Sequence, residues 1–455
     1  MKKKSHLLLL VSAICALFCP QAQGQPYYNF AMGTELPSTY NPCHAVIRTI
    51  DAQSAVAYYG GPGVAVSKLL YINLNPFIIA GLELTGGYDE IKDIRIENGV
   101  VFFCGRNSQT YKGFIGHVKL SDLAGSVPGS IICSNVDIPG VQSIMWRLAA
   151  YDDGTGITRV VSIGNAWFHS SPYFYTCSAT TCQSTFVVEC KYDAITNLMS
   201  SVGMKVVGVD TRFERADDVV VTDHWLAIVS NYPAQSQLII HRCSKNNVLA
   251  TFNNYYAYTV PYLEGVNHCC LMRGDTIADA TLYCTNGGAP YGSSLRVFDL
   301  NTMTMTCAQR FDLLDKAEPL EMAYLPEYAT LVTLQWQMYP SGQKHYNFVS
   351  WRPYDSTPYY AKLTYETADH KLECMDKLTT KHVVATGGDY WLMKDIINDI
   401  PSTTCYTIAQ QSVDALQPSQ PVYGSNNYSA YTLILQRNSY GSPIPVYLNK
   451  GCITP

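Results

Sequence analysis

The sequence has no apolar run long enough to cross a membrane as a helix. Its most apolar stretch, Leu7–Phe18, reads LLLLVSAICALF and has twelve residues, whereas a bilayer-spanning helix needs about 20. The three lysines at positions 2–4 precede this stretch, and Ala22-Gln23-Gly24 follows it. A positive start, a short apolar segment and small residues at a cleavage site are typical of a secretory signal peptide.

We therefore expect residues 1–24 to be a signal peptide and residues 25–455 to be exported, to the periplasm, the cell surface or the medium. A lipid anchor on Cys15 or Cys19 is the alternative. The residues before these cysteines are Ile14 and Phe18, and both are bulkier than the small residue that bacterial lipidation requires. The sequence therefore favours a product without lipid.

Charge is also scarce, at 15% of the residues. Removal of the signal peptide takes away three lysines, which leaves 28 basic residues against 36 acidic ones. Nucleic-acid binding needs a basic surface that displaces counterions from phosphates. No basic run remains in the mature chain, so we expect no nucleic-acid partner.

The usual motifs of catalytic and metal sites are missing. The chain has no G-x-S-x-G elbow, no phosphate-binding G-x-x-x-x-G-K-[ST] loop and no C-x₂-C pair. His268-Cys269-Cys270 is its tightest group of possible metal ligands, and no H-x₃₋₅-H partner follows it. We therefore predict no metal and no cofactor.

The chain has 16 cysteines, of which 14 lie after the signal peptide. An oxidising compartment would permit up to seven disulfides among them. Cys177 and Cys182 are separated by four small or polar residues between two short β-type runs. Their side chains would face each other across the mouth of a hairpin, which makes them the candidate disulfide pair.

Short apolar runs joined by tight polar turns repeat along the chain. In the clearest copy, Asn98-Gly99 separates Ile91–Ile96 from Val100–Cys104, and Asn-Gly between such runs is the strongest short signal for a hairpin. The other copies are Ala45–Ile50 with Ala55–Tyr59, Ser143–Ala150 with Thr158–Ile163, Asp218–Val221 with Leu226–Val229, Val266–Met272 with Ala280–Cys284, Glu321–Leu325 with Thr330–Leu334, and Val383–Thr386 with Tyr390–Met393.

The repeat spacing of about 58 residues leaves room for about four strands per unit, which defines a propeller blade. We predict an all-β fold, a single β-propeller over residues 25–455, with seven blades favoured over six. Two β-sandwich domains are the alternative. We expect N- and C-terminal strands to close the ring, with Ala430–Gln436 or Pro445–Leu448 adding an inner strand to the first unit.

In these hairpins, its signal peptide and its tyrosine-rich, acidic composition, the chain resembles exported β-propellers of the kind abundant in Bacteroidetes. The resemblance implies the fold and the export, and it carries over no functional residue.

Two groups of residues suggest function. Asp89 with Glu90, and Asp217 with Asp218, are paired carboxylates of the kind that glycosidases use, although acids next to strands also serve turns and solubility. The second group is Asn253, Asn254, Tyr255, Tyr256 and Tyr258. Its rings and amides suit a glycan, while alternate tyrosines of a strand also suit a core.

We therefore expect an exported, non-enzymatic binding module for a glycan or a protein partner. A glycan-cleaving hydrolase or lyase that uses the paired carboxylates is the alternative.

Overall fold

The computed structural model describes most of the chain between Phe30 and Gly451. The described residues are 30–34, 44–61, 67–74, 77–125, 131–138, 141–167, 184–207, 215–232, 237–251, 254–259, 269–273, 280–288, 292–311, 317–338, 344–351, 360–363, 372–380, 382–387, 390–395, 409–412, 414–415, 422–425, 430–431, 435–440 and 448–451. The expected signal peptide and the Cys177–Cys182 pair lie outside them.

The described strands form seven antiparallel sheets, six of five strands and one of four. Each sheet is named here after its innermost strand. The first three are the β2 sheet, the β6 sheet and the β10 sheet. Their strands are β2 (His44–Thr49), β3 (Ser54–Gly60), β4 (Ser67–Leu74) and β5 (Phe77–Leu84); β6 (Glu90–Glu97), β7 (Val100–Arg106), β8 (Gly113–Lys119) and β9 (Ile131–Val136); and β10 (Gln142–Asp152), β11 (Ile157–Trp167), β12 (Ser184–Asp193) and β13 (Leu198–Val206).

The β14, β18, β22 and β26 sheets follow. Their strands are β14 (Arg215–Val221), β15 (Trp225–Tyr232), β16 (Gln237–Ser244) and β17 (Asn254–Thr259); β18 (Cys269–Arg273), β19 (Thr281–Gly288), β20 (Gly292–Asp299) and β21 (Thr304–Phe311); β22 (Ala317–Leu325), β23 (Thr330–Met338), β24 (Lys344–Trp351) and β25 (Tyr360–Leu363); and β26 (Cys374–Lys377), β27 (His382–Gly387) and β28 (Tyr390–Asp395), with β1 (Phe30–Thr34) beside β28. Short helices are α2 (Leu120–Ala124), η2 (Lys245–Asn247), α3 (Val248–Thr251) and η3 (Pro326–Tyr328).

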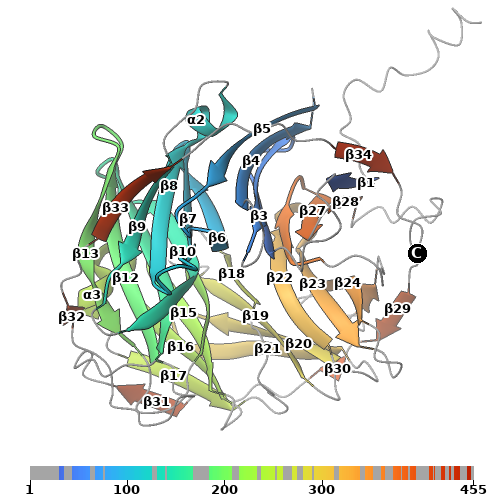
Figure 1. Cartoon of the computed structure of the whole chain (residues 1–455). Helices are drawn as coiled ribbons and strands as arrows, with labels where there is room; N and C mark the ends of the chain where they lie inside the picture. The colour runs from blue at the N-terminus through green and yellow to red at the C-terminus, as the bar shows by residue number, and fades with distance from the viewer. Residues whose placement is uncertain are drawn as a thin grey trace, which may run out of the picture.

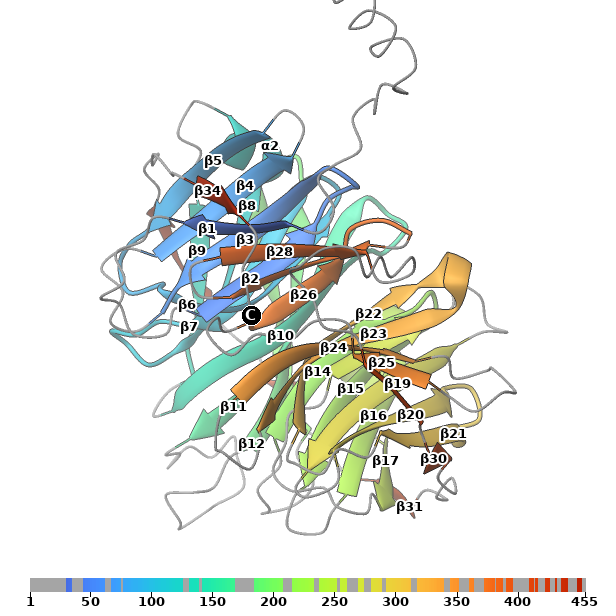
Figure 2. The same cartoon turned by 90° about the vertical axis from the view of Figure 1, so that its right-hand side faces the viewer.

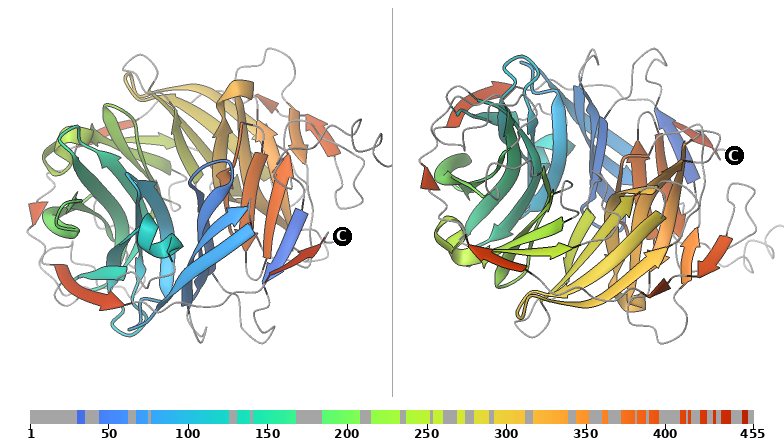
Figure 3. Two further views of the ribbon diagram at one scale, coloured as in Figure 1. Left: turned by 90° about the horizontal axis from the view of Figure 1, so that it is seen from above. Right: turned by 90° about the horizontal axis from the view of Figure 1, so that it is seen from below.

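The sheets are arranged radially around one axis (Figure 1, Figure 3). Each innermost strand contacts the next in chain order, and β26 contacts β2, so the ring is closed. Apolar clusters fill the spaces between neighbouring sheets. The prediction of an all-β propeller is confirmed, and the closed ring excludes two sandwich domains.

Six of the seven hairpins expected from the sequence are the pairs formed by the first and second strands of a sheet. The seventh, Val383–Thr386 with Tyr390–Met393, joins the second and third strands β27 and β28. The Asn98-Gly99 turn has φ of 49° and 70° at its two residues, as a type I′ turn requires.

Both ends of the described chain meet in the β26 sheet, where β1 pairs with β28 on one side and with β34 (Leu448–Gly451) on the other. The expected inner strand for the first unit from Ala430–Gln436 or Pro445–Leu448 is wrong. The strand β2 is itself the innermost strand of that sheet. The strands of the C-terminal segment instead lie on the outer edges of other sheets.

These outer strands lie on the outer edges of six of the seven sheets, and we call them the belt strands. They are β29 (Ala409–Ser412), β30 (Asp414–Ala415), β31 (Val422–Ser425), β32 (Ala430–Tyr431), β33 (Leu435–Tyr440) and β34. In that order they pair with β25, β21, β17, β13, β9 and β1. The chain therefore winds backwards past the sheets that it has already built (Figure 1, Figure 2).

The buried free thiols in the described part of the chain include Cys104, Cys133, Cys190, Cys243 and Cys374. They lie on strands inside the sheets and pack as small apolar residues. The sequence permitted bridges among these cysteines, and the structure does not form them.

Candidate functional site

Four innermost strands each contain one β-bulge, and a charged residue follows each bulge. The register shifts lie between Ile91 and Asp93, Met145 and Arg147, Ala216 and Asp218, and Pro319 and Glu321. A bulge bends the strand and re-aims the next side chain. The same backbone device therefore places Asp93, Arg147, Asp218 and Glu321 on the inner side of the ring.

Arg48 on β2 connects two of these acids. Its Nη2 lies 2.7 Å from Oδ1 of Asp93 and 3.2 Å from Oε2 of Glu321. The strands β2 and β22 are not neighbours, because β26 lies between them in the ring. The contact between Arg48 and Glu321 therefore crosses the inner side of the ring past β26.

Arg147 on β10 makes the second crossing. Its Nη2 lies 3.9 Å from Oε2 of Glu321, and its Nε lies 4.0 Å from Oδ1 of Asp218. Arg95 Nη1 lies 3.2 Å from Oδ1 of Asp93. We call these six residues the axial charge cluster: Arg48, Asp93, Arg95, Arg147, Asp218 and Glu321.

The axial charge cluster is balanced and mostly buried. Asp93 is fully buried, and the side chains of Arg48 and Glu321 are each 8% exposed. Burial alone would raise the carboxyl pKa of Asp93 and of Glu321. The neighbouring guanidiniums outweigh that effect and hold both pKa values below their usual range.

Asp218 differs from the other two acids. Burial raises its pKa to about 6, and Arg147 opposes the shift only in part, while Glu321 and Asp93 add to it. Cys374 also contacts the cluster, with Sγ 3.0 Å from Nη1 of Arg48. Burial raises the pKa of this thiol to about 12, so it stays protonated and unreactive at neutral pH.

Of the four acids expected from the sequence, Asp218 alone belongs to the axial charge cluster. Glu90 forms ion pairs with Lys92 at 2.9 Å and Arg106 at 2.7 Å. Asp89 accepts a hydrogen bond from Ser108 at 2.7 Å, and Asp217 accepts one from Asn231 at 3.0 Å. The two predicted pairs thus separate into different local networks.

The expected aromatic group lies on β17 and does not form one surface. Tyr258 is fully buried, packs against Phe298 at a ring-centroid distance of 4.7 Å, and donates a hydrogen bond to the Met303 carbonyl. Tyr255 and Tyr256 are half-buried. The belt strand β31 covers the outer edge of β17, with Tyr256 opposite Tyr423.

Asn254 begins β17 and lies opposite Ser425 of β31. Asn253 lies outside the described residues. The core interpretation therefore accounts for Tyr258, and the edge of the strand is already occupied.

Sequence reasoning missed Arg48, Arg147 and Glu321. Each is a single charged residue in a short and otherwise mostly apolar run that begins a repeat unit. Comparison of the first strand in every unit would have shown this pattern. The ion-pair partners of these residues could not have been inferred from the sequence, because the ion pairs join residues up to 273 positions apart.

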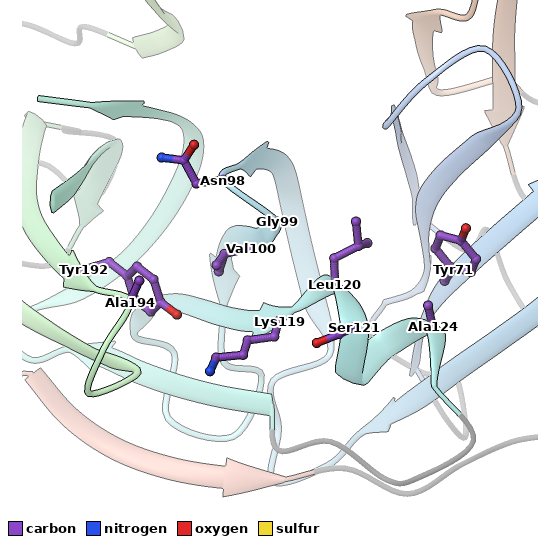
Figure 4. A pocket seen from close by; sticks show the side chains of 10 residues that line it. All are labelled: Tyr71, Asn98, Gly99, Val100, Lys119, Leu120, Ser121, Ala124, Tyr192 and Ala194. Atoms are coloured by element: carbon purple, nitrogen blue, oxygen red, sulfur yellow. The ribbon is translucent and has the colours of Figure 1, made fainter. Parts of the chain in front are cut away.

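A separate groove of about 500 Å³ lies outside the ring axis. The strand β4, the β6–β7 turn, α2 and the end of β12 line it. Tyr71 and Tyr192 lie at its opposite ends, and Asn98, Lys119 and Ser121 supply an amide, an ammonium and a hydroxyl (Figure 4). The hydroxyl of Tyr192 is fixed by a 2.8 Å hydrogen bond to Asn197 Oδ1. The ring of Tyr192 is 1% exposed and packs against Phe102 and His117. The groove therefore presents the half-buried ring of Tyr71 beside these polar groups.

Within the part of the chain that the structure describes, no helix is long and apolar enough to cross a membrane. The same residues contain no group of three or more histidine, cysteine or acidic side chains placed to hold a metal ion.

Comparisons with known proteins identify no family. No protein-family model matches the chain, and neither does any curated protein. Among solved structures, a post-proline cleaving enzyme from Rickettsia typhi is similar at a TM-score of 0.30 and 8% identity, over 68% of this chain and 49% of that one. A structure from a study of two prolyl endopeptidases is similar at a TM-score of 0.21 and 9% identity. That similarity covers 79% of this chain and 59% of the other. The chain thus spans about half the length of the first of these proteins, and neither similarity carries an inference about activity.

Proposed function

We propose that this chain is an exported, non-enzymatic binding module that holds a glycan in the groove between Tyr71 and Tyr192. The start of the sequence supports export. The lining of the groove supports the ligand class, because the half-buried ring of Tyr71 can pack against a sugar face while amide, ammonium and hydroxyl groups bond sugar hydroxyls.

The axial charge cluster supports a binding role over a hydrolytic one. A glycosidase needs two carboxyl groups that reach the substrate. Here the three axial carboxylates are 8% exposed or less, and each lies within 4.0 Å of an arginine. Their charges are directed at one another and hold the innermost strands together.

The observation that carries the proposal is the combination of the Asn98, Lys119 and Ser121 side chains with the half-buried ring of Tyr71 in one groove. A glycan array probed with the wild-type protein tests it. Ser121 is exposed on α2, so Ser121→Trp is expected to fill the groove and to weaken binding at least tenfold. Thr304→Trp, on the exposed side of β21, is the matched control and should bind as the wild type does. A folded wild type that binds no glycan, or equal binding by Ser121→Trp, would overturn the proposal.

A glycan-cleaving activity is the second candidate, and the pKa of Asp218 favours it. A carboxyl group with a pKa of about 6 has the protonation behaviour of a general acid. Release of reducing sugar from polysaccharides by the wild type, abolished in Asp218→Asn, would support this activity. Its absence in both proteins would remove it.

A further inference from the structure

A second group of charged and aromatic side chains lies at the end of the β6 sheet that is remote from the groove. The groove reaches the turn between β6 and β7 at Asn98-Gly99, whereas Glu90 lies opposite Arg106 at the other end of these two strands. We call this group the Arg106 site. It comprises Glu90 and Lys92 on β6, Arg106 on β7, Tyr111 in the β7–β8 loop and Trp146 on β10.

The Arg106 site carries more positive than negative charge. Glu90 Oε1 lies 2.9 Å from Lys92 Nζ, and its Oε2 lies 2.7 Å from Arg106 Nε. Burial alone would raise the carboxyl pKa of Glu90, but the two cations outweigh burial and hold this pKa below its usual range. The neighbouring Asp89 accepts from Ser108 and forms no ion pair with another described residue. Two cations thus share one ionised carboxylate.

The guanidinium of Arg106 is fixed on one side and open on the other. Its Nε donates to Glu90, and its Cζ lies 5.9 Å from the centre of the Tyr111 ring. The side chain is 30% exposed. Among the residues that the structure describes, neither Nη atom of Arg106 has a hydrogen-bond partner. The end of the guanidinium therefore presents its N–H groups to solvent in a defined orientation.

Arg242 shows how the same propeller satisfies an arginine that serves the fold. Its guanidinium also packs on an aromatic ring, with Cζ 4.3 Å from the centre of Trp225. However, its Nη1 donates to the carbonyls of Leu300 and Asn301. Arg106 has the aromatic contact without such acceptors, so a structural role leaves the end of its guanidinium unexplained.

The backbone of the β7–β8 loop holds Tyr111 in an unfavourable conformation. Tyr111 has φ of 55° and is 49% exposed. Its N–H donates to the Asn107 carbonyl at 2.8 Å, and its carbonyl accepts from the Ser143 N–H at 3.0 Å. Positive φ is rare for a bulky residue, and such strain concentrates at functional sites. The strain here keeps an aromatic ring at the surface beside Arg106.

We propose that the Arg106 site binds the carboxylate of an acidic sugar, a uronic acid. The two carboxylate oxygens accept from the open Nη groups, since a guanidinium matches a carboxylate with two parallel hydrogen bonds. The sugar ring then packs against the exposed face of Tyr111. One carboxylate also balances the single excess positive charge, whereas a phosphate monoester carries close to two negative charges at neutral pH.

Titration of glucuronate into the folded wild type, followed by NMR, tests the site at dissociation constants as weak as about 1 mM. We expect glucuronate to bind more tightly than glucose and glucose 6-phosphate. Arg106→Lys keeps the charge but loses the two-pronged geometry, and it should weaken glucuronate binding at least tenfold. Ser121→Trp is the control for the groove and should leave this binding unchanged. No binding by the wild type, equal binding of the three sugars, unchanged binding in Arg106→Lys or loss of binding in Ser121→Trp would overturn the proposal.

Tyr111→Gly separates binding from folding in the same protein. Glycine adopts positive φ without strain, so this variant should unfold at the same temperature as the wild type or at a higher one. It should nevertheless bind glucuronate at least tenfold more weakly, because the ring is lost. Ala329→Gly relieves a positive φ on the β22 sheet and should bind as the wild type does. Unchanged affinity in Tyr111→Gly, or weakened affinity in Ala329→Gly, would overturn the proposal.

Discussion

The Nη2 atom of Arg48 lies 2.7 Å from Oδ1 of Asp93, and this ion pair joins the first two innermost strands of the propeller. Arg48 also donates to the Ile94 carbonyl at 3.2 Å. The same guanidinium reaches Glu321 across the ring. One side chain thus connects three sheets at the point where their inner strands converge.

Replacement of Arg48 by methionine should destabilise the fold by about 3–5 kcal/mol, because it leaves Asp93 and Glu321 buried with one fewer cation. Arg95→Met is the control, since Arg95 is 28% exposed and contacts Asp93 alone among the acids. We expect it to cost about 1 kcal/mol. Urea unfolding at pH 7 measures both, and equal losses would contradict the role assigned to Arg48.

The pKa of Asp218 predicts an unusual pH dependence. The value is about 6 in the folded chain against a usual 3.8, so the folded state binds this proton more readily between those pH values. The free energy of unfolding should therefore fall by about 2 kcal/mol as the pH rises from 4 through 6. Asp93 and Glu321 act in the opposite sense, because their lowered pKa values make stability fall when the pH drops below about 4.

Asp218→Asn separates these effects. This variant should lose the decline between pH 4 and pH 7 and should equal or exceed the wild type in stability at pH 8. The acid-side loss should remain, since Asp93 and Glu321 are unchanged. Chemical denaturation at pH 5 and pH 8 measures the difference, and a wild type more stable at pH 8 than at pH 5 would argue against the raised pKa.

Two turn positions provide a reciprocal test of backbone strain. Gly99 has φ of 70°, and a Cβ there would meet no atom within 4 Å, so Gly99→Ala should cost about 1 kcal/mol through conformation alone. Ala329 has φ of 45° at the end of η3, and Ala329→Gly should stabilise by a few tenths of a kcal/mol or more. Thermal unfolding of both variants measures these changes. A Gly99→Ala variant that is more stable than the wild type, or an Ala329→Gly variant that is less stable, would contradict the positive φ at these residues.

The free thiols can be counted chemically. Cys104, Cys133, Cys190, Cys243 and Cys374 are buried, so iodoacetamide should not modify them in the native protein. In denaturant without reductant all five should react, and peptide mass spectrometry identifies each. A cysteine of this set that stays blocked after denaturation would show a bridge that the structure does not contain.

The sequence predicted the repeat because each unit begins with a hairpin whose turn residues are local signals. Asn98-Gly99 shows this best, since positive φ at both residues is encoded at the turn itself. The spacing of these hairpins along the chain also predicted the number of strands in each unit and the all-β fold class.

The belt strands could not be predicted in that way. The strand β32 has two residues, and its structure depends on a partner more than 200 positions earlier, since Tyr431 lies opposite Met204. Nothing in so short a run indicates which edge it joins. The first unit was misassigned for this reason.

The axial charge cluster was predicted only in part. Asp218 was identified as one of two adjacent acids, yet the bulge at Asp217 separates their environments. One acid faces the arginines, and the other accepts a hydrogen bond from Asn231. A bulge is a property of two paired strands, so the sequence of one strand does not reveal it.

The most direct test of the proposed binding role is a glycan array on the folded wild type, with Ser121→Trp and Thr304→Trp beside it and released sugar measured on every bound glycan. The account predicts binding without product formation, lost in Ser121→Trp and retained in Thr304→Trp. Release of sugar by the wild type that disappears in Asp218→Asn would contradict it.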